Sequence, residues 1–332
     1  PAEQLGQLRL PIPVWRKHTP DRRNRRHPFH RTACAYTRQM TGLPAAPDGA
    51  PRRTRTGQRW QELPRGLVGA CHPVPGLAVT SVAVVLAIGT GLTAERVALF
   101  GAAVFTGQLS IGWSNDMIDA ARDRAVGRTD KPVATGTVPQ SVIAAAASTA
   151  LVATIVLSSL LGPAAAAALL IGVAAGWAYN LGLKATAWSG ATYLLAFGAL
   201  PIAPYVASPG QPWPPWWVPV VGALLGFAAH FANVLPDLRA DAQTGVRGLP
   251  HRLGPRTGVI VMAVALATAS VVLGVAPATT SSGFALAVPA IGITLAAATA
   301  AAAVRAPRSP LAFRLTIVIA ILDVALLITN AI

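Results

Sequence analysis

The chain is poor in charge, and above all in acidic residues. Only 12% of its 332 residues are charged, against about a quarter in a typical soluble domain, and 53% are hydrophobic. Most of its surface must therefore face something other than water, which excludes an ordinary soluble domain. Its two cysteines, Cys34 and Cys71, provide neither a disulfide framework nor the spacing of a cysteine metal site.

The sequence contains many long apolar runs. A run of about 18 to 23 residues lets a helix cross a hydrocarbon core of roughly 30 Å. The sequence therefore predicts an all-α membrane protein, residues 67–332, with nine transmembrane helices. The predicted spans are 73–92, 97–114, 141–160, 163–181, 187–207, 215–236, 256–275, 283–303 and 311–331.

Basic residues orient these spans. With the amino terminus inside, every lysine and arginine except Arg96 falls on an inside segment or its flank. Short cytoplasmic loops of membrane proteins carry such an excess of positive charge. The pattern predicts a multi-pass protein of the cell membrane, N-in and C-out, in contact with membrane lipids. It says nothing about the oligomeric state.

Residues 1–66 form a basic segment rich in proline and arginine, with fourteen Lys and Arg against four acids. Without apolar periodicity it cannot bury enough surface to offset its ordering entropy, so we expect a disordered tail. Its charge favours anionic lipid headgroups, and no nucleic-acid partner is expected.

The few acids of the membrane region are concentrated in two places. Eight carboxylates occur after Leu67, and five of them fall in two short clusters that read Asn-x3-Asp-x3-Asp-x3-Gly; a sixth, Asp130, follows the first cluster. Each cluster ends a long apolar run, where a buried Asp costs roughly 2.5 to 3.5 kcal/mol. The residues are Asn115, Asp116, Asp119 and Asp123 in the first cluster, and Asn233, Asp237 and Asp241 in the second.

A constant offset of 118 residues, or four predicted spans, relates the two clusters. Because an even number of crossings restores the chain direction, both clusters end their helices at the same, cytoplasmic, membrane face. We therefore expect two pseudo-repeated four-helix units plus one helix. The clusters should face each other across a shared cavity.

The residue types in these clusters suit a magnesium ion. Residues four apart share a helix face, so each cluster presents a stripe of oxygen atoms. Mg²⁺ prefers a few carboxylates together with substrate phosphates and water, and helix carboxyl ends add partial negative charge. The stripes predict six metal ligands: Asn115, Asp119, Asp123, Asn233, Asp237 and Asp241.

Basic side chains follow the acids on the same predicted face. A diphosphate leaving group needs its growing charge neutralised by metal and basic side chains in a site that excludes water. The candidate diphosphate contacts are Arg124, Arg128, Lys131, Lys184 and Arg239.

These residues resemble the motifs of the UbiA-type intramembrane prenyltransferases over about residues 72–332. The family's Asn-Asp-x2-Asp-x3-Asp motif is matched by the first cluster and its second Asp-x3-Asp motif by Asp237 and Asp241. The basic continuation of the first motif is matched by Arg128, Thr129, Lys131 and Pro132.

The resemblance implies transfer of a prenyl group from a prenyl diphosphate to an aromatic or other lipophilic acceptor, with Mg²⁺ held by both Asp motifs. It also adds Asp116 to the metal ligands. A prenyl carbocation would form and be captured by an acceptor carbon. The expected catalytic residues are Asp119, Asp237, Asp241 and Lys184.

Two positions depart from the family pattern. The family's Tyr-x3-Lys motif appears as Tyr179-x4-Lys184, which makes Tyr179 a further candidate diphosphate contact. Family members that prenylate aromatic acids often have an Arg-Pro pair entering the first helix, where this chain has His72-Pro73.

Other functions use similar residues. A membrane terpene cyclase on the same scaffold would ionise the same diphosphate and fold the cation on itself, with the same metal site. A secondary transporter also pairs acids in a helix bundle, but near the midplane on broken helices. The sequence leaves the roles of two residues open. His230 could reach the acceptor or make a structural hydrogen bond, and Asp323 could serve function or packing.

Overall fold

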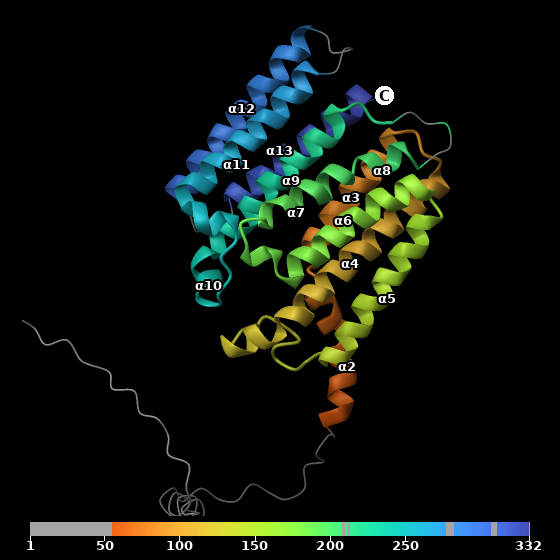
Figure 1. Cartoon of the computed structure of the whole chain (residues 1–332), viewed down its shortest axis with the longest axis vertical. Coiled ribbons are helices and arrows are strands. Elements are labelled where there is room, and N and C mark those ends of the chain that lie inside the picture. The colour runs from red at the N-terminus through yellow and green to blue at the C-terminus, as the bar shows by residue number, and fades with distance from the viewer. Residues whose placement is uncertain (1–54, 208–209, 211–212, 277–281, 307–310, 332) are drawn as a thin grey trace, which may run out of the picture. The chain divides into compact units, whose positions relative to one another are not determined.

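The computed structural model describes residues 55–207, 210, 213–276, 282–306 and 311–331, and the regular structure within these ranges is helical throughout (Figure 1). The amino-terminal half of this part contains α2 (Arg55–Ala70), α3 (Pro73–Gly89), α4 (Ala94–Ala125), α5 (Gln140–Ser159) and α6 (Pro163–Leu181). A short helical turn, η1 (Leu183–Ala185), follows α6.

The carboxyl-terminal half has a comparable order of elements. It contains α7 (Ser189–Ala199), α8 (Ile202–Tyr205), α9 (Trp217–Val234), the turn η2 (Leu235–Asp237), α10 (Leu238–Gln243), α11 (Leu249–Val275), α12 (Ser282–Arg305) and α13 (Leu311–Ala331). In the first half α4 packs against α3, α5 and α6; in the second, α9 packs against α7, α11 and α13. Because α13 also contacts α3, it joins the two halves.

Glycines let the motif helices approach their neighbours closely. A Cβ added to Gly107 on α4 would lie 2.9 Å from the Val173 side chain of α6. On α9, a Cβ at Gly226 would overlap the Phe197 ring of α7. Small residues at such contacts are how membrane helices gain close packing. They fix α4 against α6, and α9 against α7.

Fewer helices qualify as membrane spans than the sequence predicts. Within the described ranges, six are long and apolar enough to cross a membrane, or seven if the pair Glu62–Ala70 and Pro73–Gly89, bent by 61°, counts as one. The predicted span 187–207 is divided into α7 and α8 at Pro201, which lacks the N–H that would continue the helix. Within α13, the described residues include an apolar stretch at Ile317–Leu326. Nine spans and an N-in orientation stay predictions.

The predicted boundary of the tail falls inside a helix. Residues 55–66 were expected to be disordered, but they belong to α2. Leu63 and Leu67, one turn apart, pack on the cluster that contains Ala120, and the indole nitrogen of Trp113 donates to the Leu67 carbonyl at 2.9 Å. The many charged residues around this narrow apolar face make it hard to recognise from the sequence. Residues 1–54 lie outside the described residues.

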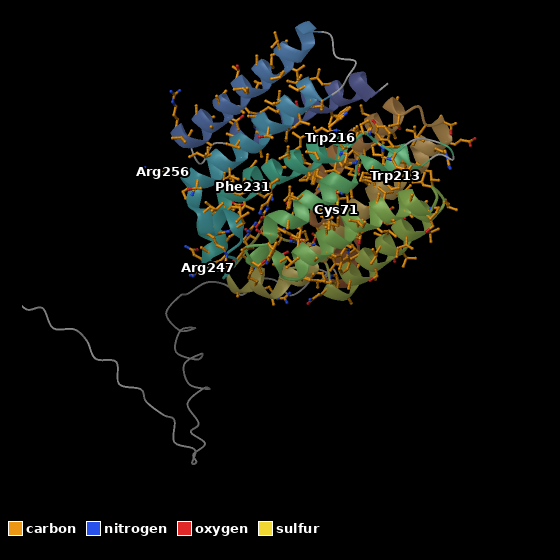
Figure 2. The ribbon with its side chains drawn as sticks, turned by 45° about the horizontal axis from the view of Figure 1, so that its top comes forward. Cys71, Trp213, Trp216, Phe231, Arg247 and Arg256 are labelled. Carbon is orange, nitrogen blue, oxygen red and sulfur yellow. The ribbon has the colours of Figure 1, made fainter. Side chains whose placement is uncertain are left out.

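Both motifs come to one end of the helix layer. Figure 1 shows α10 at the same end as the carboxyl ends of α4 and α6, as the 118-residue offset predicts. Figure 2 shows Arg247 and Arg256 on this side. Trp213 and Trp216, which precede the first residue of α9, lie on the other side. The two tryptophans are exposed, which is typical of an interfacial position.

Candidate active site

The first motif occupies the last turns of α4, where its three carboxylates are buried. Asp116, Asp119 and Asp123 are 1%, 6% and 5% exposed. Carboxylates at this depth in an apolar helix need partners that compensate for the loss of water.

Lysine provides that partner for Asp119. Both Asp119 oxygens accept hydrogen bonds from Lys184 Nζ at 2.6 Å, and Arg122 Nη2 lies 2.7 Å from Oδ2. Lys184 itself is only 9% exposed. Burial lowers the pKa of Lys184, and the hydrogen bonds to Asp119 only partly oppose the shift. The pair is thus a buried ion pair at the core of the predicted site.

A glycine explains how Lys184 reaches Asp119 despite its longer spacing from Tyr179. Gly182 ends α6 with φ 149°, a conformation that favours glycine, and η1 follows directly. This turn accommodates the additional residue. Despite the one-residue departure from the family pattern, Lys184 reaches Asp119.

Asp116 has a second set of basic partners. Its Oδ1 lies 2.7 Å from Lys131 Nζ and 3.3 Å from His72 Nε2, and these two nitrogens are 3.0 Å apart. His72 is the one non-glycine residue in the described ranges with a positive φ, 52°. Its strained backbone enters α3 with the imidazole at the site. The other carboxylate oxygen, Oδ2, is buried without a hydrogen-bond partner in the described part of the chain.

The second motif is more open than the first. Pro236 follows the end of α9, and the chain continues as η2 and α10, so Asn233 and Asp237 are exposed. Asp241 is one-third exposed, with Oδ2 at 3.7 Å from His251 Nε2. Burial raises the pKa of Asp241; His251 opposes this shift and Asp237 adds to it.

Charge interactions connect the two motifs. Asp241 interacts with Arg122 and Lys184, while Arg128 interacts with Asp123 and Asp237. Basic side chains near the acids of α4 are therefore close enough to interact electrostatically with the acids of η2 and α10.

The side chains of the two motifs carry the type of ligand atom that Mg²⁺ prefers. The motif side chains offer oxygen atoms, including the unpartnered Oδ2 of Asp116 and the carboxylate of Asp123, which makes no hydrogen bond to described residues. Among the residues described, however, no three His, Cys, Asp or Glu side chains are grouped to hold a metal ion. Lys131 is paired with Asp116 and Lys184 with Asp119. The predicted ligand set stays a prediction.

The chain matches known proteins along most of this region. The UbiA prenyltransferase family matches residues 76–322. The chain belongs to this family. A relative, the bacteriochlorophyll synthase 33 kDa chain of Cereibacter sphaeroides, is 31% identical over 180 residues, which cover 51% of this chain and 59% of the relative. The match thus spans less than two thirds of that relative's length.

Solved structures share the family fold. A UbiA homologue from Archaeoglobus fulgidus, bound to GPP and Mg²⁺, matches with a TM-score of 0.65 at 15% identity, over 80% of this chain and 99% of that one. An apo UbiA homologue from Aeropyrum pernix K1 matches with a TM-score of 0.62 at 18% identity, over 77% of this chain and 98% of that one. The sequence-based resemblance to the UbiA family is confirmed.

The structure distinguishes among the predicted diphosphate contacts. Lys131 contacts Asp116 and Lys184 contacts Asp119, and Tyr179 immediately precedes Asn180, which accepts a hydrogen bond from Asn115. Arg128 is paired with Asp130 by two hydrogen bonds of 2.7 Å, which lower the pKa of Asp130 to about 2.

Two predicted arginines are less well placed. Arg124 is exposed, and among the described residues its side chain makes one hydrogen bond, of 3.5 Å, to the Val133 carbonyl. The side chain of Arg239 lies outside the described residues.

Sequence reasoning missed two members of the site. Arg122 lies three residues after Asp119 on α4, a spacing that predicts their contact. Asn180 is harder to predict because its contacts are to another helix. Asn115 donates to Asn180 Oδ1 at 3.1 Å, and the Asn180 amide donates to Ser114 Oγ at 2.8 Å. These bonds connect the first motif to α6.

Proposed function

We propose that this protein is a Mg²⁺-dependent prenyltransferase that moves a prenyl group from a prenyl diphosphate to an aromatic or other lipophilic acceptor within the membrane. The observation that carries the proposal is the pairing of each of two buried motif carboxylates with a lysine, Asp119 with Lys184 and Asp116 with Lys131. Each pair can separate into a metal ligand and a phosphate contact.

If the carboxylates exchange lysine for Mg²⁺ and the lysines exchange carboxylate for diphosphate, every charged side chain keeps a partner of opposite charge in this poorly hydrated site. The carboxylates that leave the lysines would hold Mg²⁺, and the lysines would bind the diphosphate oxygens. Asn115, Asp123, Asn233, Asp237 and Asp241 would complete the metal-binding set. When bound, Mg²⁺ neutralises the negative charge that grows on the leaving group. GPP and Mg²⁺ bound to a homologue of the same fold support the assignment.

The remaining chemistry follows from the same residues. The bond between the prenyl carbon and the diphosphate oxygen breaks, and its electron pair leaves with the diphosphate. Lys131, Lys184 and Arg122 stabilise that charge, and an acceptor carbon forms the new bond. The acceptor then loses a proton, and the partly exposed carboxylate of Asp241 would receive it.

The alternatives differ from this proposal in measurable ways. A terpene cyclase would use the same diphosphate site without a second substrate. A transporter would place its acids near the membrane midplane, whereas the first motif occupies the last turns of α4.

Diphosphate release by the purified full-length chain tests the proposal. Prenyl diphosphates of several lengths are supplied with and without Mg²⁺, and with and without a panel of lipophilic phenols. Release that requires both Mg²⁺ and a phenol, with a prenylated phenol as product, is expected. Release without a phenol, accompanied by a cyclic hydrocarbon or alcohol, would identify a cyclase. No release under any condition would contradict both enzymatic functions.

A further inference from the structure

A buried histidine lies beside the proposed metal site and takes no part in it. His230 is on α9, one turn before Asn233, and is 1% exposed. The centroid of its ring lies 4.7 Å from that of Tyr193 on α7 and 5.9 Å from that of Tyr179 on α6. Three helices therefore contribute to an aromatic cluster around this imidazole.

The aromatic cluster adjoins both motifs. His230 lies one turn before Asn233 of the second motif, and Tyr179 immediately precedes Asn180, which accepts a hydrogen bond from Asn115 of the first motif. Along α7, the rings of Tyr193 and Phe197 are nearly parallel, at 4°, with centroids 6.0 Å apart. The cluster thus places aromatic rings next to the place where the prenyl cation would form.

A chain of hydrogen bonds holds one side of the imidazole. The backbone N–H of Leu249 donates to Ser189 Oγ at 2.8 Å, and Ser189 Oγ lies 3.1 Å from His230 Nε2. Close approach of α11 to α7 makes this possible, because a Cβ at Gly248 would lie 2.9 Å from Ser189 Oγ. The contact is therefore built into the packing of the helices.

This chain of bonds selects one tautomer of neutral His230. If Ser189 donates its hydroxyl proton to Nε2, the ring proton is on Nδ1, and one buried group lacks a partner. If Nε2 carries the proton instead, both the Ser189 hydroxyl proton and the Nδ1 lone pair lack partners. Since every unmade buried hydrogen bond is unfavourable, the first arrangement is preferred.

The remaining donor has no partner in the described part of the chain. His230 Nδ1 is buried and makes no hydrogen bond there. A diphosphate would be repelled by the negative faces of the surrounding rings, and a prenyl chain has no atom that accepts a hydrogen bond. A neutral oxygen on an aromatic molecule satisfies both the donor and the rings.

We propose that His230 Nδ1–H binds an oxygen of the acceptor substrate, and that the acceptor is a planar aromatic molecule carrying a carbonyl, ether or hydroxyl oxygen. Its ring lies against Tyr193, next to the prenyl diphosphate. The inference rests on the proposed function, because it assigns the subsite of the second substrate. His230 is then a specificity-determining residue that contacts substrate.

Two isosteric probes test the hydrogen bond without requiring turnover. 2-Acetylnaphthalene and 2-isopropenylnaphthalene differ in one group, C=O against C=CH2. Equilibrium dialysis of the full-length protein in detergent, with Mg²⁺ and a non-hydrolysable prenyl diphosphate analogue, gives a Kd for each. The Kd of the wild-type protein should be about tenfold lower for the ketone. Because detergent partitioning is the same for all variants, changes in the Kd ratio report the site.

A matched pair of variants separates the two nitrogens of His230. In His230→Asn the amide nitrogen takes the place of Nδ1, so the preference for the ketone should be retained. In His230→Gln the amide takes the place of Nε2, which keeps the contact to Ser189 and loses the donor. The Kd ratio should fall from about ten to about one. A His230→Phe variant should also lose the preference.

Two results would overturn the inference. One is a wild-type protein that binds both probes equally, which needs no variant to fold. The other is a His230→Gln protein with the wild-type Kd ratio and an unchanged thermal midpoint. Failure of the proposed function has a different signature, namely no Mg²⁺-dependent diphosphate release with any acceptor, whatever the probes show.

Discussion

Lys184 Nζ lies 2.6 Å from both carboxylate oxygens of Asp119, and the two side chains are buried together between η1 and α4. Removing one member of such a pair strongly lowers the free energy of unfolding, because the remaining charge is buried without a partner and with little water. Stability and activity at this position therefore respond differently to mutation.

Asp119→Ala should abolish diphosphate release and also lower the free energy of unfolding by about 3 kcal/mol, since Lys184 is left buried and unpaired. Asp119→Ala/Lys184→Met should recover most of that stability and none of the activity. Asp237→Ala is the matched control: Asp237 is exposed, so activity should be lost at an unchanged thermal midpoint. A single Asp119→Ala variant as stable as the wild type would contradict the importance of the pair.

The close contact at Gly248 gives a second prediction. A Cβ there would lie 2.5 Å from the Lys184 carbonyl as well as near Ser189, so Gly248→Ala should separate α11 from η1. We expect kcat to fall about tenfold, corresponding to a slight displacement of Lys184. Gly172→Ala on α6 is the control, because its Cβ would make only an ordinary contact at 3.6 Å. Equal kcat values for the two variants would show that the Gly248 contact does not position the site.

The amino-terminal segment can be divided at the start of α2. Removal of residues 1–54 should leave kcat nearly unchanged, because no motif lies there. Removal of residues 1–66 also takes Leu63 from its packing near Ala120, and should lower the thermal midpoint by several degrees. Comparing the two truncations by kcat and thermal unfolding checks this boundary. A large loss of kcat in the shorter truncation would mean that the segment acts on the site.

Sequence periodicity predicts the motif helices well and their surroundings less well. The i, i+4 spacing of Asp119 and Asp123 requires only a helix, and α4 provides it. The charge partners depend on tertiary structure: Lys184 reaches Asp119 through the φ of Gly182, and His72 reaches Asp116 through its own positive φ. Neither backbone conformation is indicated by hydrophobic pattern.

Hydropathy alone also misjudges interrupted helices. The run 187–207 is apolar enough for a span, but Pro201 divides it. Conversely, residues 55–66 are polar enough to predict disorder, but one face with Leu63 is sufficient for packing. In both cases local backbone chemistry or a narrow apolar face outweighs average composition.

The two motifs should differ in their contributions to metal binding. Asp116 has no counterpart in the second motif, where Val234 stands, and its buried Oδ2 is free of protein partners in the described ranges. Asp116→Asn removes that negative charge and should raise the Mg²⁺ concentration for half-maximal rate about tenfold, with a rate that recovers in excess metal. Asp241 is more open to solvent, which suits a group that accepts a proton. Asp241→Asn should therefore lose about 10²-fold in rate even at saturating Mg²⁺. Magnesium titrations of both variants check the assignment: full rescue of Asp241→Asn by excess metal, without rescue of Asp116→Asn, would mean that the roles are reversed.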